Sequence, residues 1–317
     1  CYTLSPIHNL ESYVKLAKQI ESLGVGSICV KDMAGIMSPK EGYDLVKALK
    51  ETVKVPVVVH THSTTGLGFM TLLKCVEAGA DVIDTAISSF SGGTSQPATE
   101  TLVYALRQLG YEVGVDEKVC KEINDFFKPI RDKALKSGLL NPVVMGTQTD
   151  ALIYQIPGGM LSNLVAQLTA QKKLDKLDEV LEETPRVRKD LGYPPLVTPM
   201  SQMVGVQATA NVLAGERYKN ISKEVKSYIK GEYGKAPGEV SPELQKLVLG
   251  DEKPYTGRFA DTLEPGVEAA RAYLGSRATC DEDVLSYIAF PTQAEAFFDK
   301  RDAKKKNTFS YTIRKVD

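Results

Sequence analysis

The chain has 317 residues, of which 43% are hydrophobic and 25% charged, and its formal net charge is -1 at pH 7. These values predict an ordered globular protein with a large core spread over more than one domain. The charge gives no electrostatic basis for binding nucleic acid, and no apolar run reaches the ~20 residues that span a bilayer. The five cysteines include no CxxC pair, which favours a reducing cytoplasm over a disulfide framework.

Short apolar strands alternate with amphipathic helices in the first 110 residues or so. The predicted strands are residues 1–4 (the end of a strand), 27–31, 55–60 and 81–85. The predicted helices are residues 10–23, 39–50, 68–78 and 99–109. This alternation predicts a parallel sheet with right-handed crossovers, in which function gathers at the carboxyl ends of the strands. Strand composition does not separate a barrel from an open sheet.

Helical patterns take over after about residue 113. The predicted helices are residues 117–136, 160–172, 174–191, 203–214 and 221–230, followed after a connector by 264–273 and 281–300. The change of pattern predicts a second, all-helical region and a smaller third one.

Two of the chain's three histidines, His60 and His62, stand at the end of the strand at residues 55–60. Because side chains alternate between the faces of a strand, both imidazoles are expected to point to one side, as two ligands of one metal ion must. Lys31 ends the neighbouring predicted strand. Imidazole pairs suit zinc or a similar divalent ion. On spacing alone, a pair of buried, hydrogen-bonded histidines is an equally good interpretation, and Lys31 by itself is typical of a solvated lysine.

Three loop motifs also precede predicted helices. The segment SGGTSQP at residues 91–97 is typical of a flexible turn, although its glycines would let backbone N–H groups approach an anionic ligand. It matches neither GxxxxGKS nor GxGxxG, so nucleotide binding is not predicted. The motifs QIPGGM at 155–160 and TPMSQMVG at 198–205 are explained by helix capping or close packing, Ser201 included.

Taken together, the motifs resemble the carboxyltransferase subunit of biotin-dependent enzymes, a family that includes oxaloacetate decarboxylase, pyruvate carboxylase and transcarboxylase. The motifs that carry the resemblance are VKDMAG (30–35), HTHSTTG (60–66), DTAISSFSGGTSQP (84–97), YQIPGGMLSNL (154–164) and PLVTPMSQMVG (195–205). The resemblance continues through DEDVLSYIAFP at residues 281–291 and so covers nearly the whole chain.

The resemblance implies the following site. His60 and His62 match two histidine ligands of a divalent metal, Lys31 matches a carboxylated lysine ligand, and Thr198 matches a threonine that exchanges a proton with biotin. The implied metal is zinc, with manganese or cobalt as alternatives. The remaining candidates, for binding substrate or biotin, are Thr94, Ser95, Gln96 and Ser201.

The resemblance also implies an α/β fold with a TIM (β/α)8 barrel. The chain shows about four of the eight strand-helix units of such a barrel. We therefore expect residues 1–112 to form the C-terminal half of the barrel, strands 5–8, residues 113–245 a helical funnel, and residues 246–317 a connector and a small C-terminal helical region. The family's metal-binding aspartate and substrate arginine are expected in the front half of the barrel, outside this sequence, so the fragment alone is expected to be inactive.

The implied activity is carboxyl transfer between carboxybiotin and pyruvate or oxaloacetate. Biotin is expected on another domain or chain. The implied partners are a biotin carboxyl carrier protein, a biotin carboxylase or membrane decarboxylase subunits, and a second copy in a homodimer. The implied localisation is the cytoplasm. Membrane-bound partner subunits would make the protein peripheral to the membrane. The alternatives are a metal-dependent aldol-type lyase or synthase acting on acyl-CoA, and an inactive truncated scaffold fragment.

Overall fold

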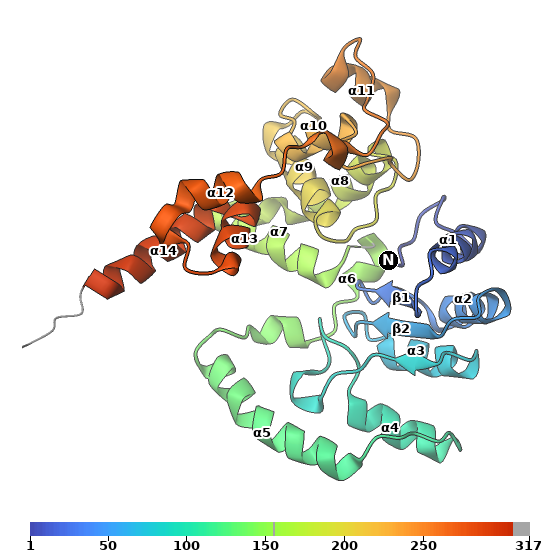
Figure 1. The fold of residues 1–317 in the computed structure, drawn as a ribbon. Helices are drawn as coiled ribbons and strands as arrows, with labels where there is room; N and C mark the ends of the chain where they lie inside the picture. The colour runs from blue at the N-terminus through green and yellow to red at the C-terminus, as the bar shows by residue number, and fades with distance from the viewer. Residues whose placement is uncertain (155, 307–317) are drawn as a thin grey trace, which may run out of the picture. The chain divides into compact units, whose positions relative to one another are not determined.

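A computed structural model describes residues 1–154 and 156–306 of the chain (Figure 1). The chain divides into two compact units, of which the first is Cys1–Thr256 and the second begins at Gly257. Within the first unit, residues 1–108 are called the sheet region and residues 156–250 the helical region. In the described part of the chain, no helix is both long and apolar enough to cross a membrane.

The sheet region is an alternating α/β structure with a parallel sheet, as predicted, but the sheet has three strands where four were predicted. The strands are β1 (Ile28–Asp32), β2 (Val57–Thr61) and β3 (Val82–Ile83), in the order β1-β2-β3. The helices between and around them are α1 (Leu10–Ser22), α2 (Pro39–Thr52), α3 (Gly68–Glu77) and α4 (Thr99–Gln108). The register of β1 and β2 sets Lys31 opposite His60.

Burial alternates along β1 and β2, so each strand has one buried face. Val30, Val57 and Val59 are buried and pack with Leu45 and Leu72 of the helices. Figure 1 shows α1, α2 and α3 along one side of these strands, which is the side that this core fills. Because side chains alternate, Lys31 and His60, one residue before the strand ends, point to the other, more open face of the sheet.

Two strand predictions are wrong in extent. Residues 1–4 do not form a strand, because after the Tyr2 N–H donates to the Lys31 carbonyl (2.8 Å) the chain turns back, and Ser5 pairs with His8. The predicted strand at residues 81–85 is reduced to β3. The Asp81 carboxylate turns aside to accept the Val57 N–H (2.7 Å), and Asp84 donates its N–H to Val59 (2.9 Å) beyond the end of the strand.

The chain continues almost entirely as helices. These are α5 (Glu117–Lys136), α6 (Asp150–Tyr154), α7 (Gly158–Ala170), α8 (Leu177–Asp190), α9 (Met200–Ala214), α10 (Lys223–Ile229) and α11 (Pro242–Leu249). Helix α5 has the predicted bounds. Helix α9 begins three residues earlier than predicted, directly after Pro199, so Ser201 lies in its first turn rather than before it.

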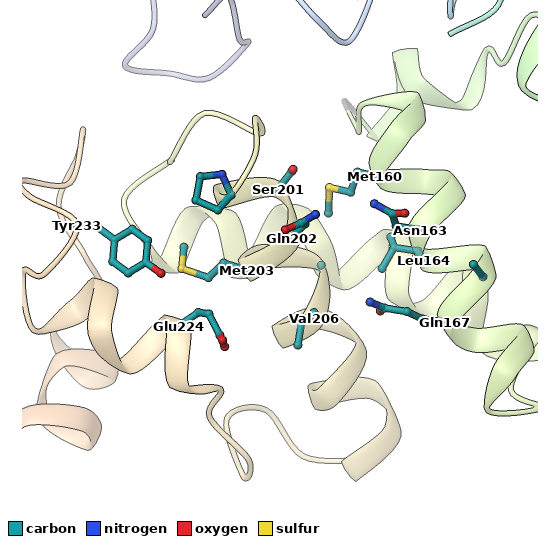
Figure 2. Close-up of a pocket in the computed structure, with 13 residues that line it drawn as sticks. Met160, Asn163, Leu164, Gln167, Ser201, Gln202, Met203, Val206, Glu224 and Tyr233 are labelled. Carbon is teal, nitrogen blue, oxygen red and sulfur yellow. The ribbon is translucent and has the colours of Figure 1, made fainter. Parts of the chain in front are cut away.

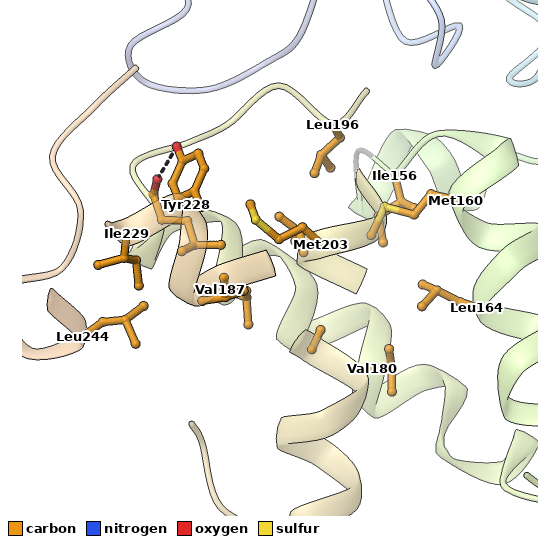
Figure 3. Close-up of a cluster of buried hydrophobic side chains, with 14 of the residues drawn as sticks. Ile156, Met160, Leu164, Val180, Val187, Leu196, Met203, Tyr228, Ile229 and Leu244 are labelled. Atoms are coloured by element: carbon orange, nitrogen blue, oxygen red, sulfur yellow. Dashed lines mark hydrogen bonds between the residues drawn. The ribbon is translucent and has the colours of Figure 1, made fainter. Parts of the chain in front are cut away.

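The helical region has an apolar core of its own (Figure 3). Leu168 from α7, Val180 and Val187 from α8, and Val204 from α9 are wholly buried there. The Tyr228 hydroxyl donates to the Leu191 carbonyl (3.0 Å) at the edge of this core, so the buried phenol is also satisfied.

The second unit contains α12 (Val267–Leu274), α13 (Asp281–Ala289) and α14 (Pro291–Lys306). The single helix predicted at residues 281–300 is therefore two helices. Phe290 between them leaves the helical conformation (φ -144°, ψ 67°), which the following Pro291 disfavours for the residue before it. The core of this unit is small and centres on Val284 and Phe298.

Candidate functional site

His60 and His62, the two histidines of the HTHSTTG motif, face one another at the carboxyl end of β2. The Nε2 atoms of His60 and His62 lie 3.0 Å apart, and the ring centroids 5.1 Å apart. The expectation that both rings point to one side is confirmed by these distances.

The other nitrogen of each ring is held by an acceptor from a neighbouring segment. His60 Nδ1 lies 2.9 Å from the Asp84 carboxylate, and His62 Nδ1 lies 2.6 Å from the Thr94 carbonyl oxygen. A carboxylate and a carbonyl only accept, so both Nδ1 atoms carry the hydrogen and both Nε2 atoms carry a lone pair. Acceptors placed in this way fix the tautomer and orientation of metal-binding histidines.

His62 is also kept neutral by its surroundings. Burial of the ring lowers its pKa most, the nearby His60 ring and the Lys31 ammonium group lower the pKa further, and the hydrogen bond to Thr94 raises it in part. The neutral imidazole is the form that binds a metal ion.

Lys31 lies beside His60 in the sheet register and is exposed on the open face. Among residues 1–154 and 156–306, no three His, Cys, Asp or Glu side chains gather as a metal-binding group. The donor set therefore fits part of a divalent-metal site: two imidazole nitrogens converge, and the further ligands would come from other groups.

The SGGTSQP loop, residues 91–97, also contacts the histidine pair. Gln96 Nε2 lies 3.3 Å from His60 Nε2 and 3.2 Å from His62 Nε2, and its Oε1 accepts from the Ser95 hydroxyl (3.1 Å). Ser95 also accepts the Ser63 N–H with its carbonyl oxygen (2.7 Å). The structure thus brings Thr94, Ser95 and Gln96 to the histidine pair, Thr94 through its backbone only.

Close backbone contacts explain two glycines around this loop. Gly93 has φ +50°, and a Cβ there would overlap the Val144 carbonyl and lie 2.7 Å from Met145 Cα. A Cβ on Gly158, at the start of α7, would lie 2.7 Å from a methyl group of Thr64 and 3.2 Å from one of Thr94. The N-terminus of α7 is therefore packed against the loops that hold the histidines.

Thr198 is exposed and lies two residues before the first residue of α9. Residues 195–197, just before it, line a small cavity together with Met33, Ala34 and Ile36 of the loop that follows β1. In the described part of the chain, no hydrogen bond joins Thr198 or Ser201 to the histidine pair. The structure places the three residues just before Thr198 beside the loop after Lys31.

A pocket of about 510 Å³ lies between α7 and α9 and includes Ser201. Figure 2 shows Met160 and Leu164 of α7 across from Gln202 and Met203 of α9. Its lining combines carboxamide and thioether groups with the carboxylate of Glu224, so it offers both hydrogen bonds and apolar contacts.

Asp84 is a site residue that sequence reasoning left unassigned. Its carboxylate orients His60, and it follows β3, the strand next to β2 in the sheet. A carboxylate at the carboxyl end of the neighbouring strand is a usable signal, because those ends of parallel strands meet at one edge.

Residues 151–315 match the "Conserved carboxylase domain" family, and residues 5–127 match the "HMGL-like" family. A pyruvate carboxylase subunit of Methanocaldococcus jannaschii is 52% identical over 300 residues, covering 94% of this chain and 53% of the relative. The methylmalonyl-CoA carboxyltransferase 5S subunit of Propionibacterium freudenreichii subsp. shermanii is 45% identical over 311 residues, covering 95% and 60%. The 2-oxoglutarate carboxylase large subunit of Hydrogenobacter thermophilus is 43% identical over 310 residues, covering 95% and 47%.

Among solved structures, the carboxyl transferase domain of Rhizobium etli pyruvate carboxylase, solved with pyruvate and biocytin, superposes with a TM-score of 0.85 at 29% identity. The superposition covers 95% of this chain and 54% of that one. The chain thus spans about half the length of the relatives that it matches.

Proposed function

The chain belongs to the family of biotin-dependent carboxyltransferases that carry the conserved carboxylase domain, and from this premise we propose that it transfers a carboxyl group between carboxybiotin and the pyruvate/oxaloacetate pair. The observation that supports this function is the histidine pair, with two Nε2 lone pairs converging where the N-terminus of α7 packs over the strand ends. Lone pairs that face each other at 3.0 Å repel unless a donor or a cation lies between them.

His60, His62 and a carbamate formed on Lys31 would hold the divalent ion, with zinc the proposed metal and manganese or cobalt the alternatives. The ammonium group of Lys31 would repel a cation, whereas its carbamate would supply an anionic oxygen from the adjacent register position. When bound, the ion would supply Lewis-acid polarisation of the pyruvate carbonyl.

Thr198 would move the proton. The Thr198 hydroxyl would give its proton to the biotin ring nitrogen as the bond from that nitrogen to the carboxyl carbon breaks, and its oxygen would take a methyl proton from pyruvate in exchange. The methyl carbon would form the new bond to that carboxyl carbon. This role needs distance and orientation more than a shifted pKa. Thr198 follows residues 195–197, which lie beside the loop after Lys31, and comes three residues before Ser201 of the pocket, which supports the assignment.

In this proposal residues 1–112 supply strands 5–8 of a TIM barrel, residues 113–245 a helical funnel, and residues 246–317 the connector and C-terminal helices. Three parallel strands with polar residues at their carboxyl ends support a barrel. Thr94, Ser95, Gln96 and Ser201 would contact substrate or biotin.

Biotin would arrive on another domain or chain, and the proposed partners are a biotin carboxyl carrier protein, a biotin carboxylase or membrane decarboxylase subunits, and a second copy of the chain. The word "subunit" in the names of three relatives supports a multi-part assembly. The proposed place is the cytoplasm.

Two alternatives differ in substrate. An aldol-type acyl-CoA lyase is disfavoured because the HMGL-like match ends at residue 127, whereas the carboxylase match continues through the helical region. 2-Oxoglutarate as the carboxyl acceptor is favoured by one relative's name and would be separated from pyruvate by a direct competition assay.

The test is Thr198→Ala in the native protein with its partners. We expect pyruvate-dependent carboxyl transfer to fall at least about 100-fold, the range of lost proton-transfer catalysis, while metal content stays unchanged. Thr198→Ser should retain part of the activity, and Thr169→Ala, an exposed threonine on α7, should retain all of it. Full activity in Thr198→Ala would refute the proton-transfer role.

A further inference from the structure

The side-chain amide of Gln96 lies beside the histidine pair and contacts both rings. The three nitrogen atoms form a triangle with edges of 3.0, 3.2 and 3.3 Å. A tetrahedral zinc ion with ligand atoms at about 2.0–2.1 Å sets those atoms about 3.3–3.4 Å apart. The amide nitrogen of Gln96 therefore occupies a position at ligand spacing from both imidazoles.

The hydrogen-bond network assigns the orientation of this amide. Both histidine Nε2 atoms accept, because both Nδ1 atoms donate to Asp84 and Thr94. The Ser95 hydroxyl donates to Gln96 Oε1 at the other end. The NH₂ group therefore faces the histidines and satisfies the lone pairs of both.

An amide NH₂ group cannot stay in this position beside a cation, because its hydrogens carry partial positive charge and an amide nitrogen offers no lone pair for coordination. We propose that Gln96 is a displaceable cap of the metal site, and this rests on the metal site of the proposed function. Its amide holds the two imidazoles converged and gives up both hydrogen bonds when an ion binds.

The surroundings allow this displacement. Ser95 is the neighbouring residue, and its hydroxyl can donate or accept, so it can satisfy the amide after the amide turns. The loop itself is fixed by the Thr94 N–H, which donates to Val144 (2.9 Å), so the motion is confined to the side chain.

A cap that must be displaced lowers the apparent affinity for the ion, because the free protein is stabilised by the contacts that binding breaks. Removing the amide should therefore tighten binding. A net hydrogen bond is worth a few-fold to tenfold in an equilibrium constant, so two of them predict a gain of about tenfold.

The experiment is Co²⁺ titration of the native protein against a competing chelator, followed by the visible absorption of the bound ion. Gln96→Leu and Gln96→Ala should each bind Co²⁺ about tenfold more tightly than wild type and with a faster association rate. Gln108→Leu, on the exposed end of α4, is the matched control and should bind as wild type does.

Unchanged affinity in both Gln96 variants would overturn the cap. Weaker binding in both would also overturn it and would make Gln96 a ligand instead. If wild type binds no Co²⁺ at all, the proposed metal site fails and the cap fails with it, whereas binding by wild type without tightening in the variants refutes the cap alone.

Discussion

In the sheet region the core lies on one side of the strands only, whereas in the helical region apolar side chains from α7, α8 and α9 meet in one enclosed cluster. The strands place Val57 and Val59 against the helices and leave Lys31 and His60 on the open face. In the helical region Val180, Val187 and Leu168 have no exposed surface. The open face of the sheet is thus available for chemistry because a rigid core lies behind it.

Polar groups show the same contrast. In the helical region Asn211 donates to Glu183 (2.8 Å), and Arg217 donates to the same carboxylate (2.7 Å), so the buried polar groups are paired within the chain. In the sheet region the Nε2 lone pairs of His60 and His62 converge on one point, where the side-chain amide of Gln96 donates to both. The buried polar groups of the helical region are satisfied by one another, whereas the contact that satisfies the histidines is one that a bound ion would replace in the proposed site.

Truncation of the enclosed core tests one side of this comparison and should have the largest effect. Leu168→Ala removes a wholly buried side chain from the helical region and should lower the free energy of unfolding by about 2–5 kcal/mol. The measurement is urea denaturation of the whole chain. Leu247→Ala, at a position 60% exposed on α11, should change it by less than about 0.5 kcal/mol. Equal effects of the two variants would contradict an enclosed core.

Loss of the carboxylate that holds His60 tests the sheet region. Asp84→Ala frees the His60 ring while leaving the fold intact, since the Asp84 side chain is 44% exposed. Metal affinity should fall by about 10–100-fold, the usual cost of losing such an outer contact. Asp44→Ala on α2, which pairs only with Lys40 on the surface, should leave metal affinity unchanged. A similar loss in both variants would remove the case for an orienting role.

The second unit adds a third region to the comparison. Its apolar core is small, so a partly buried ion pair should make a measurable contribution to its stability. Asp283 accepts from the Thr279 N–H (2.7 Å) and from Arg301 (2.9 Å), which lower its pKa to about 2. An unfolded aspartate has a pKa of about 3.9, so this stabilisation is complete above pH ~4 and is lost as the pH falls toward 2.

Asp283→Asn should therefore reduce the stability of this unit by about 1 kcal/mol at neutral pH, a value that allows for solvent screening. Hydrogen exchange in α13, measured in the whole chain, should show the loss. The difference from wild type should vanish at low pH, and a difference that persists there would exclude the carboxylate as its cause.

The periodic parts of this fold were predictable from sequence. Helix α5 has the predicted bounds because its apolar residues recur at helical spacing and Asp116 caps its first turn. The parallel direction of β1, β2 and β3 followed from alternation alone. The break at Phe290 was missed although Pro291 marks it, because the apolar pattern continues across the proline.

Of the candidate site, the same-face placement of His60 and His62 was predictable, because it depends only on the period of a strand. The contacts of Asp84 with His60 and of Gln96 with both rings were not, since they join segments 24 to 36 residues apart. Such contacts depend on how the loops pack against one another, which the hydrophobic periodicity of the sequence does not predict. Where Thr198 contacts substrate stays a prediction.

The central claim is that the histidine pair holds a metal ion, and metal content measures it directly. The chain offers a matched control, because its remaining histidine, His8, bonds to Ser5 (2.6 Å) away from the pair. Metal analysis of the native protein after exhaustive dialysis should give stoichiometric metal in wild type and in His8→Ala, and a loss of most of it in His60→Ala and His62→Ala. Undiminished, stoichiometric metal in His60→Ala would contradict the account.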